Sequence, residues 1–79
     1  MIPLVEVKEL IESNQDITIE SEAHDLIELG LIDSMESMEL LTDLEKKYSI
    51  KFDFVDYTKP DFFTLNSIVG AINSKLKKC

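Results

Sequence analysis

The sequence predicts an all-α fold, a small four-helix bundle with three main helices and a short third helix. Two segments, residues 3–13 and 64–77, repeat apolar residues at helical spacing. Another segment, residues 34–48, follows a strong helix-start signal and is rich in good helix formers. With 79 residues and 44% hydrophobic composition, the chain is expected to form one domain, residues 1–79, around one modest core.

The first predicted helix spans Pro3 to Ser13 and ends at Asn14. Proline suits the first turn of a helix, where its missing N–H would have no partner in any case. Apolar residues then recur at helical spacing among charged ones, at Leu4, Val7, Leu10 and Ile11. We therefore expect one face of this helix to be buried.

Residues 15–25 are polar and are expected to form a long loop, a feature that is uncommon and often functional. Ile17 and Ile19 alternate with polar residues there, and we interpret them as two apolar anchors that pin the loop. Residues 25–29 are expected to form a single helical turn, which Gly30 stops.

The clearest element is a helix from Ser34 to Tyr48. Asp33 is a good N-cap, and Glu36 follows three residues later, which is the spacing of a capping box. On a helical wheel the core face comprises Leu40, Leu44 and Tyr48, with Ser37 and Leu41 at its edge. This helix is therefore expected to bury one stripe and expose the other.

Two methionines, Met35 and Met38, fall nearly opposite this core face. A helix needs only one buried stripe, so a second apolar patch needs an explanation. Either the preceding loop covers both methionines, or they grip partner proteins, a use that suits their flexible side chains. We favour docking, on a surface that would comprise Met35, Glu36, Met38, Glu39, Thr42 and Glu45.

Residues 49–55 alternate apolar and polar side chains with the period of a half-buried strand. A lone strand has no partner, so we expect an extended loop whose aromatic side chains, Phe52 and Phe54, are tucked into the core. A short third helix is expected around residues 57–63, where Pro60 limits its extent.

A fourth helix is predicted from an N-cap at Thr64 to about Lys77. Its buried stripe would comprise Leu65, Ile68, Val69, Ile72 and Leu76. Lysines gather at its C-terminal end, where the helix dipole favours cations: Lys75, Lys77 and Lys78.

The charge balance limits the classes of function. The chain has 16 acidic and 8 basic residues, a net charge of -8, which argues against nucleic-acid binding because phosphate backbones would be repelled. Such a surface speeds encounters with basic partners, and it also keeps a protein in solution. Charge by itself does not separate these two interpretations.

Because neither a targeting signal nor a membrane span is evident, we expect a cytoplasmic protein without membrane insertion. The lone cysteine, Cys79, has no partner for an internal disulfide, and a frayed terminal thiol is a simpler interpretation than a catalytic one. Residues 1–14 contain three glutamates and no long apolar run, so no signal peptide is expected. No stretch is long enough to cross a bilayer.

An enzyme or a metal site has little support. His24 is the single histidine, lies in the predicted loop far in sequence from Cys79, and is expected to be exposed. The sequence has no evident nucleophile–base pair and no Gly-rich phosphate loop. Its acidic residues lack the order of a calcium-binding loop, and no Cys/His cluster is present.

Ser34 stands in the first turn of the second predicted helix, where free N–H groups and the helix dipole stabilise an attached phosphate. The run from Asp25 to Met35, with Asp25-Leu26, then Gly30, then Asp33-Ser34-Met35, resembles the signature of acyl and peptidyl carrier proteins. The likeness continues through residues 38–48 and spans essentially the whole chain.

The resemblance implies that Ser34 bears 4′-phosphopantetheine, added from coenzyme A by a phosphopantetheinyl transferase, with Asp33 and Met35 flanking the attachment site. It also implies an adenylating acyl or amino-acid ligase that loads the carrier and an acyltransferase or synthase that unloads it. The chain would then be a monomeric, non-catalytic carrier that tethers a biosynthetic intermediate as a thioester.

The later part of the chain resembles D-alanyl carrier proteins and other freestanding aminoacyl carriers. The likeness rests on Asp56-Tyr57, Asp61-Phe62, Thr64, Asn66 and Ile68-Val69. Phe62 stands where that group has Trp, and Leu65 stands where it has Pro, so the cargo stays open. The remaining interpretations are a D-alanyl carrier for cell-envelope modification and an acidic helical adaptor that is never modified.

Overall fold

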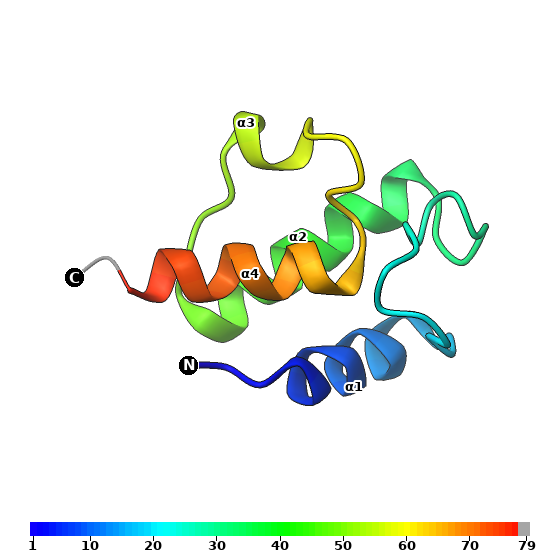
Figure 1. Ribbon diagram of the computed structural model, residues 1–79, viewed down its shortest axis with the longest axis horizontal. Coiled ribbons are helices and arrows are strands. Elements are labelled where there is room, and N and C mark those ends of the chain that lie inside the picture. The colour runs from blue at the N-terminus through cyan, green and yellow to red at the C-terminus, as the bar shows by residue number, and fades with distance from the viewer. Residues whose placement is uncertain (78–79) are drawn as a thin grey trace.

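The computed structural model describes residues 1–77 and is helical, as predicted, with no strand in that range (Figure 1). Its helices are α1 (Leu4–Gln15), α2 (Ser34–Tyr48), α3 (Phe54–Tyr57) and α4 (Leu65–Leu76). α1 packs against both α2 and α4, and in Figure 1 α1 and α3 lie on opposite sides of α4. The core lies between the three long helices.

α1 continues further than its sequence pattern predicted. Pro3 is the extended N-cap rather than a first-turn residue, and the helix runs past Asn14 to Gln15. Asp16 closes it in the left-handed conformation, with φ 53°, and its backbone N–H donates to the carbonyl of Glu12. The predicted end was wrong because the left-handed residue Asp16, and not Asn14, ends the series of helical hydrogen bonds.

The core takes apolar side chains from every long helix and from the loop between α1 and α2. Side chains with 2% exposure or less comprise Val7, Ile11, Ile19, Leu26, Leu40, Leu44, Leu65, Ile68 and Ile72. Two of these, Ile19 and Leu26, belong to the loop, so the loop is an integral wall of the core. Ile17, the other predicted anchor, is half-buried against the same cluster.

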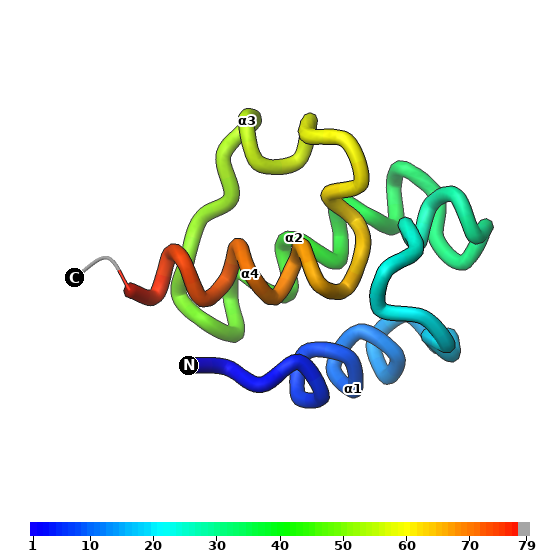
Figure 2. The backbone as a smooth tube through the Cα atoms, in the orientation of Figure 1, coloured from blue at the N-terminus to red at the C-terminus, as the bar shows by residue number. Residues whose placement is uncertain are grey.

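The loop of residues 16–33 lies at the end of the molecule opposite the N-terminus and the last turn of α4 (Figure 2). Its backbone is tied to the connection before α4, because the N–H of Leu26 donates to the carbonyl of Phe63 at 3.0 Å. The predicted single turn is present, closed by a bond from the N–H of Leu29 to the carbonyl of Asp25. Gly30 follows with φ 76°, a conformation that glycine adopts without steric cost.

The third helix was predicted around residues 57–63, but α3 spans Phe54–Tyr57 and ends where it was expected to begin. The Asp56 carboxylate accepts from the N–H of Asp53 at 2.8 Å, which starts the helix before the segment that was expected to be helical. This start turns Phe54 outward, so the prediction that it is a core residue was wrong: its side chain is 70% exposed. Phe52, two residues earlier, is buried as expected.

α4 begins as predicted, because the hydroxyl oxygen of Thr64 accepts from the N–H of Ser67 at 3.1 Å. The expected buried stripe is present except for Leu76, the last residue of the helix, which is 39% exposed because it lies past the end of the core. Lys75 does more than compensate the helix dipole, since its Nζ lies 2.7 Å from the Asp56 carboxylate. Lys78 and Cys79 lie outside the described residues.

The N-terminal segment is held to the far end of α4 by Asn73. The Asn73 side chain accepts from the backbone N–H of Ile2 at 2.7 Å and donates to the carbonyl of the same residue at 3.1 Å. This pair of bonds fixes the segment that precedes α1.

Replacing Asn73 by Ala is expected to lower the free energy of unfolding by about 1–2 kcal/mol, because two part-buried hydrogen bonds are lost. Urea denaturation measures the change. Ser74→Ala is the control, since Ser74 is exposed on the same helix and gains a similar helix propensity. Equal stability of the two variants would contradict a structural role for the Asn73 side chain.

Tyr48 joins α2 to α1, because its hydroxyl donates to the Glu6 carboxylate at 2.6 Å. Burial, together with the hydrogen bond to Glu6 and the negative charge of Glu6, raises the pKa of Tyr48 from 10.0 to about 12. The unfolded chain would therefore lose this proton at a lower pH than the folded protein does.

Stability is expected to fall as the pH rises from about 10 to about 12, since only the unfolded chain ionises its Tyr48 phenol in that window. Ultraviolet titration in a Tyr57→Phe background, which leaves one phenol, measures the pKa directly. Glu6→Gln should bring it back toward 10.0. An unchanged titration curve in that variant would refute the role of Glu6.

Candidate cofactor-attachment site and partner surface

Ser34 is the first residue of α2, and a complete capping box holds its backbone. The Asp33 carboxylate accepts from the N–H of Glu36 at 2.7 Å, and the Glu36 carboxylate accepts from the N–H of Asp33 at 3.0 Å. Both bonds match the spacing that predicted the helix start. The turn is therefore fixed by its own side chains.

Buried residues on either side of Ser34 anchor this turn to the core. Ile32, just before it, is 3% exposed, and Ser37, one turn later, is equally buried. The Ser37 hydroxyl donates to the carbonyl of Ser34 at 2.6 Å. The wheel placed Ser37 at the edge of the core face, and no sequence signal showed that its hydroxyl would brace the carbonyl of Ser34.

The Ser34 side chain is exposed, and its hydroxyl has no hydrogen-bond partner within residues 1–77. The same range offers no acceptor to the N–H groups of Ser34 and Met35. A phosphodiester on this oxygen would therefore extend outward and meet two free donors and the positive end of the helix dipole. The residues present fit a phosphate-linked group at this position.

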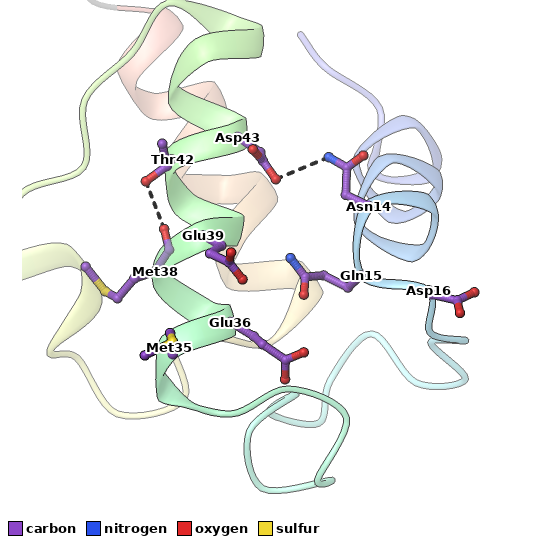
Figure 3. A pocket seen from close by; sticks show the side chains of 9 residues that line it. All are labelled: Asn14, Gln15, Asp16, Met35, Glu36, Met38, Glu39, Thr42 and Asp43. Carbon is purple, nitrogen blue, oxygen red and sulfur yellow. Dashed lines mark hydrogen bonds between the residues drawn. The ribbon is translucent and has the colours of Figure 1, made fainter.

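Both methionines of α2 lie open to solvent. Met35 is 76% exposed and Met38 is 47% exposed, so the interpretation that the preceding loop covers them is wrong. Both belong to the lining of a groove of about 670 Å³ between the outward face of α2 and the C-terminal end of α1, although in Figure 3 Met38 extends to the side of α2 away from α1. This α1–α2 groove is lined by Met35, Glu36, Met38, Glu39, Thr42 and Asp43 of α2 and by residues 14–16.

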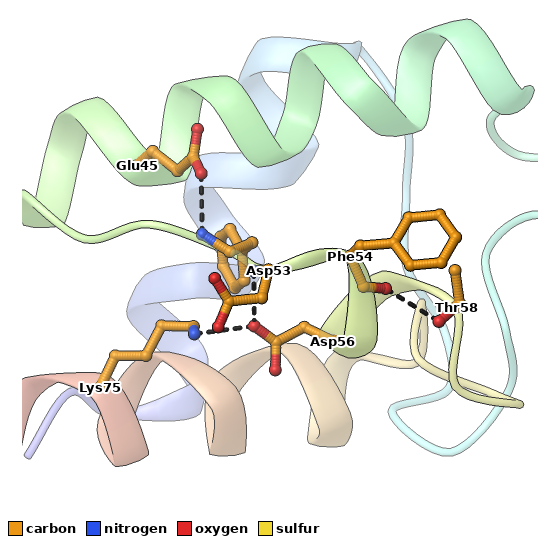
Figure 4. A network of polar contacts seen from close by, with 7 residues as sticks. Glu45, Asp53, Phe54, Asp56, Thr58 and Lys75 are labelled. Atoms are coloured by element: carbon orange, nitrogen blue, oxygen red, sulfur yellow. Dashed lines mark hydrogen bonds and ion pairs between the residues drawn. The ribbon is translucent and has the colours of Figure 1, made fainter.

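The predicted acidic rim divides into internal and outward carboxylates. Glu36 serves the capping box, and the Glu45 carboxylate accepts from the backbone N–H of Phe52 at 2.8 Å, away from the groove lining (Figure 4). Glu39 is exposed in the groove. Thr42 is exposed too, and its hydroxyl donates to the carbonyl of Met38 at 3.0 Å. Glu45 thus organises the connection to α3 rather than the groove.

The sequence reasoning missed the contribution of α1 to this surface. Asn14 and Gln15 enter the groove lining, and the Asn14 amide donates to the Asp43 carboxylate at 3.4 Å. Both residues were expected in or beside a loop, where nothing relates them to α2. Only the packing of α1 against α2 brings them together.

His24 lies in the loop before α2, exposed as expected, with its Nδ1 2.7 Å from the Ser21 hydroxyl. Within residues 1–77, no group of three acidic, histidine or cysteine residues is arranged to hold a metal ion. None of the helices in that range combines the length and apolar character needed to span a membrane.

Comparison with known proteins gives the family. Residues 5–72 match the family model described as the phosphopantetheine attachment site. D-alanyl carrier proteins of Leuconostoc citreum (strain KM20) and Leuconostoc mesenteroides are 36% and 38% identical to this chain over 50 residues. Each of these alignments spans 63% of this chain and 64% of the relative, so the matched segment is less than two thirds of either protein.

A third relative, the D-alanyl carrier protein of Streptococcus sanguinis (strain SK36), is 29% identical over 68 residues. That alignment spans 81% of this chain and 86% of the relative. No solved structure gives a significant match. Since the family model covers most of the chain, the protein belongs to the phosphopantetheine-attachment family of carrier proteins, in which 4′-phosphopantetheine is bound covalently.

Proposed function

We propose that this chain is an aminoacyl carrier protein of the D-alanyl type, with 4′-phosphopantetheine attached to the hydroxyl oxygen of Ser34. The observation that carries this proposal is the exposed Ser34 hydroxyl, free of partners within residues 1–77, at the capped start of α2. The names of the relatives favour D-alanine over a fatty-acyl or polyketide cargo.

The attachment chemistry needs only the Ser34 oxygen from this chain. That oxygen attacks the β-phosphorus of coenzyme A, a new P–O bond forms, and the pyrophosphate bond breaks with departure of adenosine 3′,5′-bisphosphate. A phosphopantetheinyl transferase supplies the base that takes the hydroxyl proton. When bound, the group supplies a thiol on a flexible arm, on which the cargo is held as a thioester.

The protein contributes a fixed position for the attachment point and an unobstructed path into solvent for the attached group. The Asp33–Glu36 capping box and the Ser37 hydroxyl hold the backbone, and the Ser34 side chain points to solvent. Tethering raises the effective concentration of the cargo at each partner's active site. The chain itself performs no catalysis: an adenylating amino-acid ligase loads it, and an acyltransferase unloads it.

The interior favours a small cargo that stays outside the bundle. Phe52, Phe62 and Phe63 are buried and pack edge to face, with ring centroids 5.9 Å apart for the first pair and 5.2 Å apart for the second. We infer that close packing of these rings leaves little room for a long acyl chain between the helices. An amino acid needs no such space. We propose a single cytoplasmic domain, residues 1–79, that acts as a monomer.

Partners would dock on the outward face of α2 beside the attachment point. Met35 and Met38 offer exposed, adaptable apolar side chains, and Glu39 offers an exposed carboxylate. Exposed charges of this kind speed encounter more than they add affinity, which suits a carrier that must leave each enzyme for the next.

Incubation with coenzyme A and a promiscuous phosphopantetheinyl transferase is expected to add one phosphopantetheine mass to the wild-type chain and none to Ser34→Ala. Intact-mass spectrometry measures both. Subsequent loading by a panel of adenylating ligases should add D-alanine but no fatty acyl group. A wild-type chain that gains no mass would instead support the unmodified adaptor.

Met38→Glu is expected to lower kcat/KM for loading about tenfold, because a charged side chain replaces an apolar contact worth roughly 1.4 kcal/mol. Its melting temperature should stay within a few degrees of wild type, since Met38 is 47% exposed. Val5→Glu, a similar change at a 57% exposed position on α1, is the control. Unfolding of Met38→Glu would show that Met38 is a core residue.

A further inference from the structure

A glutamate in the last turn of α1 holds the chain that leaves this helix. The backbone carbonyl of Glu12 accepts from the N–H groups of Asp16 and Ile17, at 3.2 Å for Ile17. The Glu12 carboxylate accepts from the backbone N–H of Ile19 at 2.7 Å. One residue thus binds three donors that follow it, and we call this arrangement the Glu12 clasp.

The end of α2 repeats the arrangement with the same spacing. The carbonyl of Glu45 accepts from the N–H groups of Ser49 and Ile50. Its carboxylate accepts from the N–H of Phe52 at 2.8 Å (Figure 4). Ser49 has φ 54° and ψ 49°, which nearly equal the 53° and 50° of Asp16. The same side chain in the same place in two separate segments indicates that the glutamate itself holds the exit from the helix.

Backbone preference does not hold either exit. Asp16 and Ser49 both carry side chains, and the left-handed conformation costs such residues free energy that glycine would not lose. What holds the exit from α1 is the clasp together with Ile19, whose side chain is 1% exposed. Because the bond to Ile19 is part-buried, loss of the carboxylate would leave its donor with poor access to water.

The two exits lead to different places. The exit from α2 leads to α3, whereas the Glu12 clasp leads into the loop of residues 16–33, which ends beside Ser34 (Figure 2). Further along, Leu26 anchors this loop through its buried side chain and its backbone bond to Phe63. Since the loop has no helix or strand of its own, its course depends on a few such fixed points, and the clasp is the first of them.

We propose that Glu12 is a positioning residue for the attachment of 4′-phosphopantetheine to Ser34. The capping box fixes the first turn of α2 internally, and the loop fixes the course of the chain that leads into it. Without the clasp the loop would open locally, and only a fraction of the molecules would present Ser34 as the transferase requires. This inference rests on the proposed function and adds a residue of α1 to it.

The test compares Glu12→Ala with Glu12→Gln. Both changes remove the charge, but glutamine keeps an oxygen that can accept from the N–H of Ile19. Asn73→Ala is the control for stability, because it loses two part-buried hydrogen bonds at the far end of α4. Amide hydrogen exchange followed by NMR should be faster at Ile19 in Glu12→Ala than in the other two variants.

Modification by the transferase gives the functional measurement. Glu12→Ala should have a kcat/KM about threefold lower than wild type, with the loss in KM, because fewer molecules present the competent arrangement. At saturating carrier concentration its kcat should equal that of wild type, since the molecules that bind react normally. Glu12→Gln and Asn73→Ala should behave as wild type in both measurements.

Three results would overturn the inference while leaving the carrier function intact. Equal kcat/KM for Glu12→Ala and wild type would show that the clasp does not position the site. An equal loss in Asn73→Ala would indicate overall stability, and an equal loss in Glu12→Gln would indicate charge. A raised KM in Glu12→Ala only supports the clasp.

A wild-type chain that stays unmodified at saturating transferase would instead sink the proposed function, and the inference with it. If Glu12→Ala does not fold, Glu12→Asp takes its place, because it keeps the charge on a side chain that is one methylene shorter. The same outcomes then decide for or against the clasp.

Discussion

The first turn of α2 is the constraint on which the rest of the structure depends. Asp33 and Glu36 satisfy each other's backbone N–H groups, so the helix begins at one defined residue. Ile32 and Ser37 are buried on either side, which fixes the direction of the backbone at this point. Ser34 is left between them with its side chain outward. Under the proposed function, this combination would hold the attachment point in a fixed position and leave its side chain open to solvent.

The long loop before α2 makes this rigidity possible. Ile19 and Leu26 fill part of the core, and backbone bonds join Leu26 to Phe63 and Asn66 to Glu22. A segment without regular structure is thus held by burial at two points and by hydrogen bonds to Phe63, just before α4, and to the first turn of α4. Loosening those anchors would release the residues that lead directly into the capping box.

The molecule separates stabilising charges from exposed ones. Glu45 and Asp56 are used within the fold, the first to cap the N–H of Phe52 and the second to pair with Lys75, which holds the pKa of Asp56 below its usual value. Glu39 stays exposed on the outward face of α2. Because exposed carboxylates contribute little to stability, the fold accommodates this acidic face at little cost, and under the proposed function the face would speed encounter with basic partners.

By itself the sequence determined the all-helical class, the bounds of α2 and the family, because caps and spacing are local signals. Tertiary structure decided the outcome at positions where two local signals conflict or where no local signal exists. The alternation that included Phe54 predicted burial, but the Asp53–Asp56 contact began α3 there and turned the ring outward. Gln15 joined the groove only because α1 packs on α2, a contact between residues far apart in the chain that no local pattern encodes.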